Sequence, residues 1–449
     1  MPKRPYGKFV KRVRKSLPWI DHLIEGEGAA RDLGREIRVL TPRWSPCLLC
    51  RGARRLCGKP KCPVMLRLYS LVETGSLVGG EELYGSSPPG LFVGRIGYPY
   101  VYIGPLVPPV VGDTSIYDYP ELWSNLGIEE IVDFRVKLVR GKTRADARHP
   151  ERLGRLSDSL VELVLSSRPV DAEVLFAKRP TGSILLDDSV QPMGPSAPVR
   201  DLRISGARAD RRLERAYYDE DLKAFEAVLE LYERGVPVSR IQRGFSAGLF
   251  GVKRRRRLVP TRWSITAVDS TISRILRDRV VKGFPPIGEY RVYESEFMGN
   301  KFLVIMMPES WSYESIEAWF PGAAWNPSTA RVAACGDWEG YRGRTSYAEM
   351  GGCYYAARLA VVEHLAREKR QASVLVLREA YPDYLLPLGV WVVREGVRKA
   401  LASKPVASSD LREILDYVSN RLKLKLDFWI DCSRLLRDAM RQEKITRFL

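Results

Sequence analysis

Four cysteines crowd one short segment near the N-terminus, and they restrict the possible folds of this region more than any other feature. They are Cys47, Cys50, Cys57 and Cys62, spaced C-x2-C-x6-C-x4-C. Two cysteines separated by two residues can turn both thiolates toward one ion, and the glycines of the loops allow the second pair to complete a tetrahedral cage. Thiolates suit zinc or an iron–sulfur cluster, and the spacing alone also permits redox thiols or unliganded cysteines. We predict a small N-terminal region held together by zinc, with an iron–sulfur cluster as the alternative.

The loops between these cysteines are basic. They contain Arg51, Arg54 and Arg55, followed by two lysines. A folded cysteine knuckle would present these cations on a small rigid surface, which suits contact with phosphates. A purely structural role for the knuckle is the alternative interpretation, and the two roles are compatible.

The whole chain shares this positive charge. Its 72 Lys and Arg exceed its 54 Asp and Glu, for a formal net charge of +18. Such a surface attracts polyanions, and we expect nucleic acid as the partner. The chain has only four Asn and four Gln, and depletion of these thermolabile residues beside many charges is typical of thermophile proteins.

The sequence gives no sign of export or of a membrane partner. The basic N-terminus lacks an apolar region and a small-residue cleavage site, and no apolar run reaches the length of a membrane span. Seven cysteines, an odd number with four of them clustered, do not resemble a secreted disulfide framework. We therefore expect a cytoplasmic protein.

Hydrophobic patterning predicts an α+β fold with a mixed, multi-layer body. Residues 83–109 read as strands broken by Gly and Pro, 211–235 as one amphipathic helix, and "YRVYESEFMGNKFLVIMMP" as a hairpin around a Met-Gly-Asn turn. Strands and helices do not alternate as in βαβ units. We divide the chain into four parts. These are a basic leader and zinc region (1–75), a β-rich α+β domain (76–190), a second α+β domain with a basic patch (191–437) and a flexible tail (438–449).

A run of five consecutive cations lies in the second of these α+β domains. It comprises Lys253, Arg254, Arg255, Arg256 and Arg257, and is followed by Arg262 and Trp263. Such a run can neutralise phosphates and release counterions, which gives salt-dependent affinity without sequence preference.

The alternative interpretation of this run is a solvated loop. After it, Asp269 or Ser270 has the character of a helix N-cap. A phosphate held by the hydroxyls at that helix start is the competing interpretation of these two residues.

Catalytic residues are not predicted. The three histidines lie in different segments, and the sequence lacks the P-loop, the dinucleotide-binding fingerprint and the nucleophile elbow. Whether the protein is an enzyme is left open.

The last residues form an apolar motif. Gln442, Ile445, Phe448 and Leu449 have the spacing Q-x2-I-x2-F-L, which places the three apolar residues on one side of a single helical turn. This is similar to the box by which replication and repair proteins dock on the PCNA sliding clamp. A helix end packed on its own domain is the alternative. Leu449 replaces the second aromatic residue of the stronger form of the box, which would weaken docking.

Together these motifs resemble the archaeal Nre family of DNA repair proteins. The resemblance includes the four cysteines, "SPPGLFVGRIGYPYVYIGPLVPP", "RRRRLVPTRWSITAVDSTIS", "FMGNKFLVIMMP" and the terminal box. It implies a role in the response to DNA damage in partnership with PCNA, and it carries over no catalytic residues.

Our leading hypothesis is a DNA repair factor that binds DNA through a basic surface and docks on PCNA through its C-terminal box. Two alternatives use the same cations. One is an enzyme acting on DNA or nucleotides, with phosphate held by the 86–104 loops or by residues 253–271. The other is an RNA-binding or ribosome-binding protein.

Overall fold

The chain forms two compact units, Met1–Val268 and Asp269–Leu449. A computed structural model describes residues 37–40, 46–50, 52, 54–185, 191–326 and 330–441. The division falls within the long helix α10 (Thr261–Arg279). It coincides with none of the three domain boundaries that we expected from the sequence.

The first unit contains a six-stranded mixed sheet within the described residues, in the order β2-β6-β8-β5-β4-β3. Neighbouring strands are antiparallel, except that β5 and β8 run parallel. A separate pair, β1 with β7, is also parallel. The strands of the unit are β1 (Ile37–Leu40), β2 (Glu82–Ser87), β3 (Leu91–Val93), β4 (Tyr100–Val107), β5 (Val139–Asp146), β6 (Val170–Phe176), β7 (Gly182–Leu185) and β8 (Ser196–Ser205).

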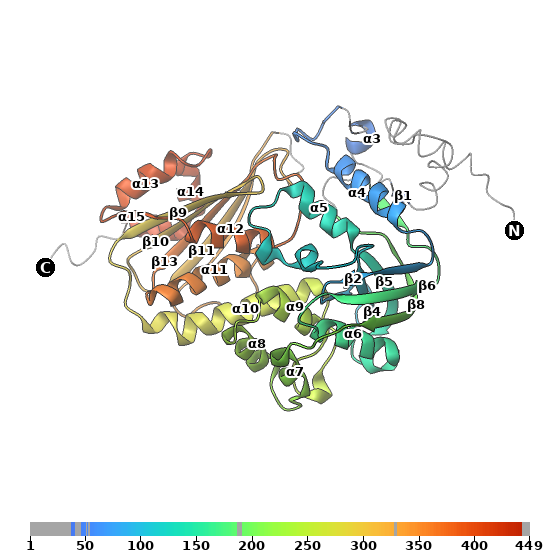
Figure 1. Cartoon of the computed structure of the whole chain (residues 1–449). Helices are drawn as coiled ribbons and strands as arrows, with labels where there is room; N and C mark the ends of the chain where they lie inside the picture. Colours follow the sequence, from blue (N-terminus) through green and yellow to red (C-terminus); the bar gives the residue numbers. More distant parts are fainter. Residues whose placement is uncertain are drawn as a thin grey trace. The chain divides into compact units, whose positions relative to one another are not determined.

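Helices of this unit pack on one another and on the sheet. Pro63 occupies the first turn of α4, where its missing N–H costs no hydrogen bond, and α4 lies beside α5 (Figure 1). The helices before α10 are α3 (Pro46–Cys50), α4 (Pro63–Leu77), α5 (Ile128–Lys137), α6 (Arg155–Leu165), α7 (Arg211–Tyr218), α8 (Ala224–Glu233) and α9 (Val238–Ser246). Short 3-10 turns occur at η2 (Ser115–Asp118), η3 (Pro120–Leu122), η4 (Pro150–Leu153) and η5 (Lys253–Arg255).

The single helix predicted over 211–235 is wrong, because the structure divides it into α7 and α8. The Asp219 carboxylate accepts hydrogen bonds from the backbone N–H groups of Asp221 and Leu222, which turns the chain out of the helix. The Arg256 guanidinium then donates to the freed carbonyl oxygen of Asp219. A local side-chain turn supported by a distant arginine therefore overrides the helical periodicity.

The second unit contains a six-stranded sheet within the described residues, in the order β12-β11-β13-β10-β9-β14. The predicted hairpin is confirmed: β9 and β10 pair antiparallel around Met298 and Gly299, which both have positive φ. Every residue of β10 and β13 is buried, as expected for strands covered on both faces. The strands are β9 (Tyr290–Phe297), β10 (Asn300–Met307), β11 (Ser312–Trp319), β12 (Ala333–Glu339), β13 (Ser373–Ala380) and β14 (Val406–Ser408).

Helices cover both faces of this sheet (Figure 1). Leu303, Ile305 and Leu375 point to one face and pack with Ile414 and Trp429 of the helices α13 to α15. On the other face α12 packs against β9 and β10. The helices are α11 (Gly352–Glu368), α12 (Trp391–Leu401), α13 (Leu411–Ser419), α14 (Leu426–Cys432) and α15 (Arg434–Arg441), with a 3-10 turn η6 (Val281–Gly283) after α10. Both units mix helices with mixed or antiparallel sheets, which confirms the α+β class.

The predicted cap at Asp269 or Ser270 is wrong, because α10 already begins at Thr261. Asp269 is fully buried and forms an ion pair with Arg394 at 3.1 Å. The acidic residue marks a buried ion pair in mid-helix rather than a helix start.

In the part of the chain that the structure describes, no helix is both long enough and apolar enough to cross a bilayer.

Candidate nucleic-acid interface

The hairpin formed by β3 and β4 exposes aromatic side chains in the first unit. Tyr100 and Tyr102 are 50% and 52% exposed, while Val101 and Ile103 between and after them are buried. Alternation along a strand places both tyrosine rings on the same, outer face. The backbone at the hairpin end is tied by a hydrogen bond from Gly94 N to the Tyr102 carbonyl oxygen, 2.7 Å long.

The start of α10 lies beside this hairpin. The Thr261 hydroxyl accepts a hydrogen bond from the backbone N–H of Val93 at 3.0 Å. Two residues later, Trp263 is 46% exposed, and its ring lies 5.1 Å from the ring of Tyr98, centroid to centroid. Sequence-distant aromatic residues therefore share one surface.

Two arginines lie near the Tyr100 ring. Arg144 on β5 lies opposite Tyr102 in the strand register, and its guanidinium carbon is 5.7 Å from the Tyr100 ring centroid. Arg148 is 6.0 Å from the same centroid and donates two hydrogen bonds, of 3.0 and 2.9 Å, to the Asp146 carboxylate. Hydrogen bonds from Arg148 lower the pKa of Asp146 to about 2. Asp146 therefore stays ionised and orients Arg148 at neutral pH.

The side chains of the predicted basic run differ in their contacts. Lys253 forms an ion pair with Glu220. Arg256 donates to the carbonyl oxygens of Gly251, Tyr217 and Asp219 at 2.6, 2.5 and 2.6 Å, so its role is to hold the chain.

The remaining cations of the run are exposed. They are Arg254, Arg255 and Arg257, and Arg262 after the run is exposed as well. None of these four arginines forms an ion pair with another described residue. Leu258 N donates to the Ala147 carbonyl oxygen at 2.8 Å, which connects the run to the end of β5. The aromatic hairpin and the basic run therefore belong to one continuous part of the first unit.

The cysteine segment is described in part. Cys50 is buried and the other three cysteines are partly buried. Burial raises the pKa of the Cys62 thiol, and the nearby Cys50 and Cys57 add to the effect. As described, however, no three or more His, Cys, Asp or Glu side chains are arranged to hold a metal ion. The spacing and the thiolate donors remain the support for zinc.

The remaining predicted site residues lie near the N-terminus and at the C-terminus, and the structure describes only some of them. Arg54 and Arg55 are exposed. Arg51 and the box residues Gln442, Ile445, Phe448 and Leu449 lie outside the described residues.

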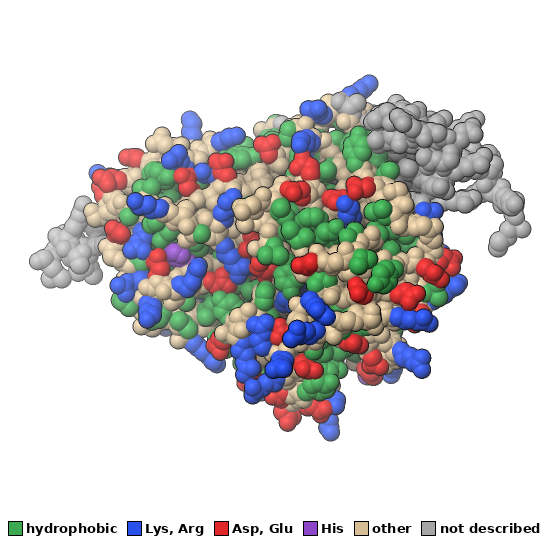
Figure 2. Space-filling model, in the orientation of Figure 1, with side chains coloured by type: hydrophobic (Ala, Val, Ile, Leu, Met, Phe, Trp, Pro, Cys, Tyr) green, Lys and Arg blue, Asp and Glu red, His purple; other side chains and the backbone are tan. Residues whose placement is uncertain are grey.

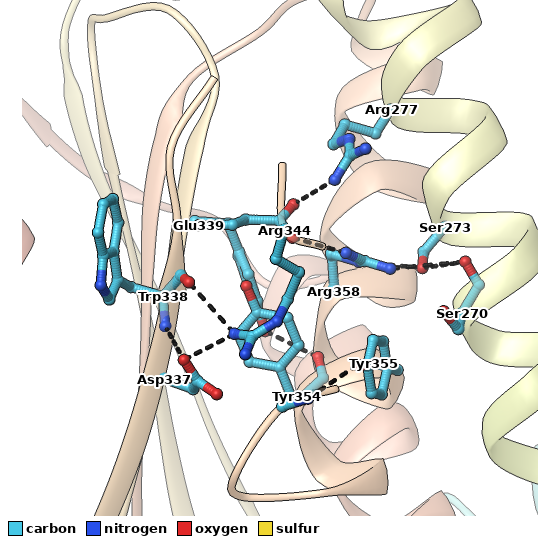
Figure 3. Close-up of polar contacts among 12 residues, drawn as sticks. Ser270, Ser273, Arg277, Asp337, Trp338, Glu339, Arg344, Tyr354, Tyr355 and Arg358 are labelled. Atoms are coloured by element: carbon cyan, nitrogen blue, oxygen red, sulfur yellow. Dashed lines mark hydrogen bonds and ion pairs between the residues drawn. The ribbon is translucent and has the colours of Figure 1, made fainter. Parts of the chain in front are cut away.

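A buried network of charges lies in the second unit, where β12, α10 and α11 meet (Figure 3). Glu339, at the end of β12, accepts hydrogen bonds from Arg277 and Arg358, each 2.7 Å long. Arg344 pairs with Asp337 at 2.6 Å. Arg277 also pairs with Asp278 at 2.7 Å, so three arginines face three carboxylates. We interpret this network as a set of contacts that fixes two helices to the sheet edge.

On the face drawn in Figure 2, basic and acidic side chains are interspersed. The net charge does not form one continuous basic half on that face. A surface that binds a polyanion would therefore be local, as at the hairpin and the basic run.

These features define an α+β protein with a surface that combines exposed aromatic rings and arginines. Two family models match it: "Archaeal Nre, N-terminal" over residues 56–326 and "Archaeal Nre, C-terminal" over residues 339–448. The chain belongs to the archaeal Nre family.

Curated relatives cover most of the chain. It is 44% identical to the "DNA repair protein NreB" of Archaeoglobus fulgidus, over 90% of this chain and 100% of the relative. It is 38% identical to the "DNA repair protein NreA" of the same organism, over 84% and 94% of the two chains. The "DNA repair protein NreA" of Haloferax volcanii is 35% identical over 76% and 84%. No solved structure matches the chain.

Sequence reasoning identified Trp263 but missed the tyrosines and Arg144. A signal was present, since "YPYVYIG" places tyrosines at every second position, the period of a strand face. What could not be predicted is that residues 98 to 102, 144 and 263 lie together, because that follows from strand pairing and from the anchoring of α10.

Proposed function

We propose that this protein is a DNA repair factor that binds DNA through the basic surface of its first unit and docks on PCNA through its C-terminal box. One observation carries the repair role: relatives that cover most of the chain are named DNA repair proteins. The protein would act in the cytoplasm, where it meets DNA directly.

DNA binding is supported by the exposed arginines next to the hairpin. Arg254, Arg255, Arg257 and Arg262 extend toward solvent and have no described carboxylate partner that would have to be displaced. Contacts of this kind neutralise phosphates and do not depend on base sequence.

The test is binding of a fluorescein-labelled duplex, followed by fluorescence anisotropy over a range of salt concentrations. We expect the triple variant R254A/R255A/R257A to weaken duplex binding and to reduce the slope of log K against log salt by roughly 0.9 for each phosphate that is no longer neutralised. The charge-matched control R367A/R370A/R412A removes three exposed arginines of the second unit. Equally weakened binding by both variants would mean that net charge, and not this surface, binds DNA.

Clamp docking is supported by the terminal spacing of Gln442, Ile445, Phe448 and Leu449. Isothermal titration calorimetry with PCNA of the same organism tests it. We expect binding that the double variant F448A/L449A abolishes and that the control K444A/T446A, which changes neighbouring residues outside the motif, retains. Loss of binding in the control as well would assign the contact to the segment and not to the box.

The metal is the third part of the proposal. We propose that Cys47, Cys50, Cys57 and Cys62 bind zinc, which would hold the segment before α4 in one conformation. Elemental analysis of the purified protein checks this: we expect about one zinc per chain, and none in C57S/C62S. Iron with sulfide in the wild type would support the cluster instead.

A further inference from the structure

We infer that the aromatic face of the β3–β4 hairpin and the start of α10 binds single-stranded DNA, with unpaired bases stacked on its rings. The rings are those of Tyr98, Tyr100, Tyr102 and Trp263. The inference rests on the proposed DNA binding and deepens it, because it specifies which form of DNA this face takes.

The rings are displayed to solvent instead of filling the core. Each of the four is at least 37% exposed, although large aromatic side chains are mostly buried in folded proteins. Tyr100 and Tyr102 are two residues apart on one strand face, a separation of about 6.6 Å. This is about twice the 3.4 Å rise between stacked bases in a strand, so neighbouring rings have room for separate bases.

The rings are also held in place before any ligand arrives. β4 is paired on both sides, with β3 and with β5. The bond from Val93 N to the Thr261 hydroxyl fixes α10 beside the hairpin, and Trp263 contacts Tyr98. A preorganised platform loses little conformational freedom on binding.

The charges around the platform fit a polyanion. Arg144 and Arg148 flank the Tyr100 ring, and the exposed Arg95 and Arg262 are next to the platform in sequence. Asp146, which lies opposite Tyr100 in the strand register, is already paired with Arg148. Backbone phosphates can therefore contact arginines on either side while the bases lie on the rings.

This combination favours a single strand over a duplex. In a duplex the flat faces of the bases are already stacked on each other, and only phosphates and groove edges are accessible. Aromatic rings with flanking cations are instead the feature by which proteins bind single strands without sequence preference, since every base has a face that can stack. The exposed arginines of the 253–257 run suit phosphates of either form.

The experiment compares a fluorescein-labelled oligo-dT with a duplex of the same length. We expect Y100A/Y102A to weaken binding of oligo-dT by roughly tenfold or more and to change duplex binding less than twofold. Y100F/Y102F keeps the rings and should restore wild-type binding. The control Y341A/Y347A removes two exposed tyrosines of the second unit and should change neither. Unfolding midpoints of all variants establish that each one is folded.

A second readout comes from Trp263 itself. Oligo-dT should quench its fluorescence by stacking, and the part of the quenching that disappears in W263L reports stacking at this ring. Suppose that the wild-type protein binds the duplex and that Y100A/Y102A binds oligo-dT as tightly as the wild type does. This result would overturn the inference and leave the proposed DNA binding in place. Failure to bind either DNA would overturn both. Tighter, Tyr100-dependent binding of oligo-U would reassign the face to RNA.

Discussion

At the scale of single residues, the second unit holds its arginines in the interior by pairing each with a carboxylate. Arg394 with Asp269 and Arg378 with Glu317 repeat the arrangement seen at Glu339. Burial of an unpaired charge is costly, so each pair stabilises the fold chiefly by avoiding that cost. Such pairs were invisible in the sequence, because the partners lie far apart along the chain.

Glu339 gives the sharpest test of this principle. Its carboxylate contacts two arginines whose side chains are 5% and 3% exposed. We expect E339A to lower the free energy of unfolding by about 3–5 kcal/mol, because the buried Arg358 guanidinium loses its carboxylate partner and Arg277 keeps only Asp278. Urea unfolding followed by circular dichroism measures this. E349A removes an exposed acid of the same unit and should change stability by no more than about 0.5 kcal/mol; a similar cost in both would contradict the argument.

His364 makes stability depend on pH. Burial lowers the pKa of His364, although the Glu368 carboxylate at 3.2 Å opposes the shift. The unfolded chain, with a histidine pKa of about 6.5, therefore binds a proton more readily than the folded protein does. As pH falls below about 6.5, the free energy of unfolding should decrease, by at most about 1.4 kcal/mol per pH unit from this residue. Urea titrations at several pH values should show a smaller decrease in H364Q, and an unchanged profile would rule out this residue as the cause.

At the scale of elements, local turn chemistry decided which sequence-based predictions succeeded. The β9–β10 hairpin was predictable because strand alternation and a Gly-containing turn agree. The 211–235 helix was not, because the competing turn at Asp219 depends on Arg256 from another segment. The start of α10 was missed for a related reason: an acidic residue that resembles a cap in sequence instead pairs with Arg394.

Gly299 is the residue on which the hairpin turn depends. Its φ is +72°, and a Cβ there would lie 2.2 Å from the backbone nitrogen of Tyr384. We expect G299A to destabilise the protein by about 1–3 kcal/mol, because both the backbone conformation and the contact become strained. Thermal unfolding measures the change. G288A is the matched control, since nothing lies within 4 Å of its added Cβ. If G288A destabilised the protein as much as G299A does, the strain at the hairpin turn would not be the cause.

At the scale of the whole molecule, composition predicted a basic protein, hydrophobic patterning predicted the α+β class, and the resemblance predicted the family. The division into two units could not be anticipated, because it falls inside α10, where helical periodicity continues without a break. The aromatic platform likewise required the fold, since it combines a hairpin, a neighbouring strand and the first turn of a helix.

The proposed functions also combine at this scale, because a DNA-binding unit and a terminal clamp box are parts of one chain. A protein held on a clamp that encircles DNA meets that DNA at a high effective concentration, which can raise the apparent affinity by about 10²–10⁴-fold without a new contact. We therefore expect the protein to bind a labelled primed template far more tightly when PCNA is loaded on it than when the template is free.

Deletion of residues 442–449 should abolish this gain and leave the affinity for free DNA unchanged, because the surface on the first unit is intact. F448A/L449A should behave like the deletion, and K444A/T446A like the wild type. Anisotropy titrations with and without loaded clamp provide all of these values. A gain that survives the deletion would place the clamp contact elsewhere in the chain, whereas a parallel loss of affinity for free DNA would mean that the terminal segment binds DNA itself.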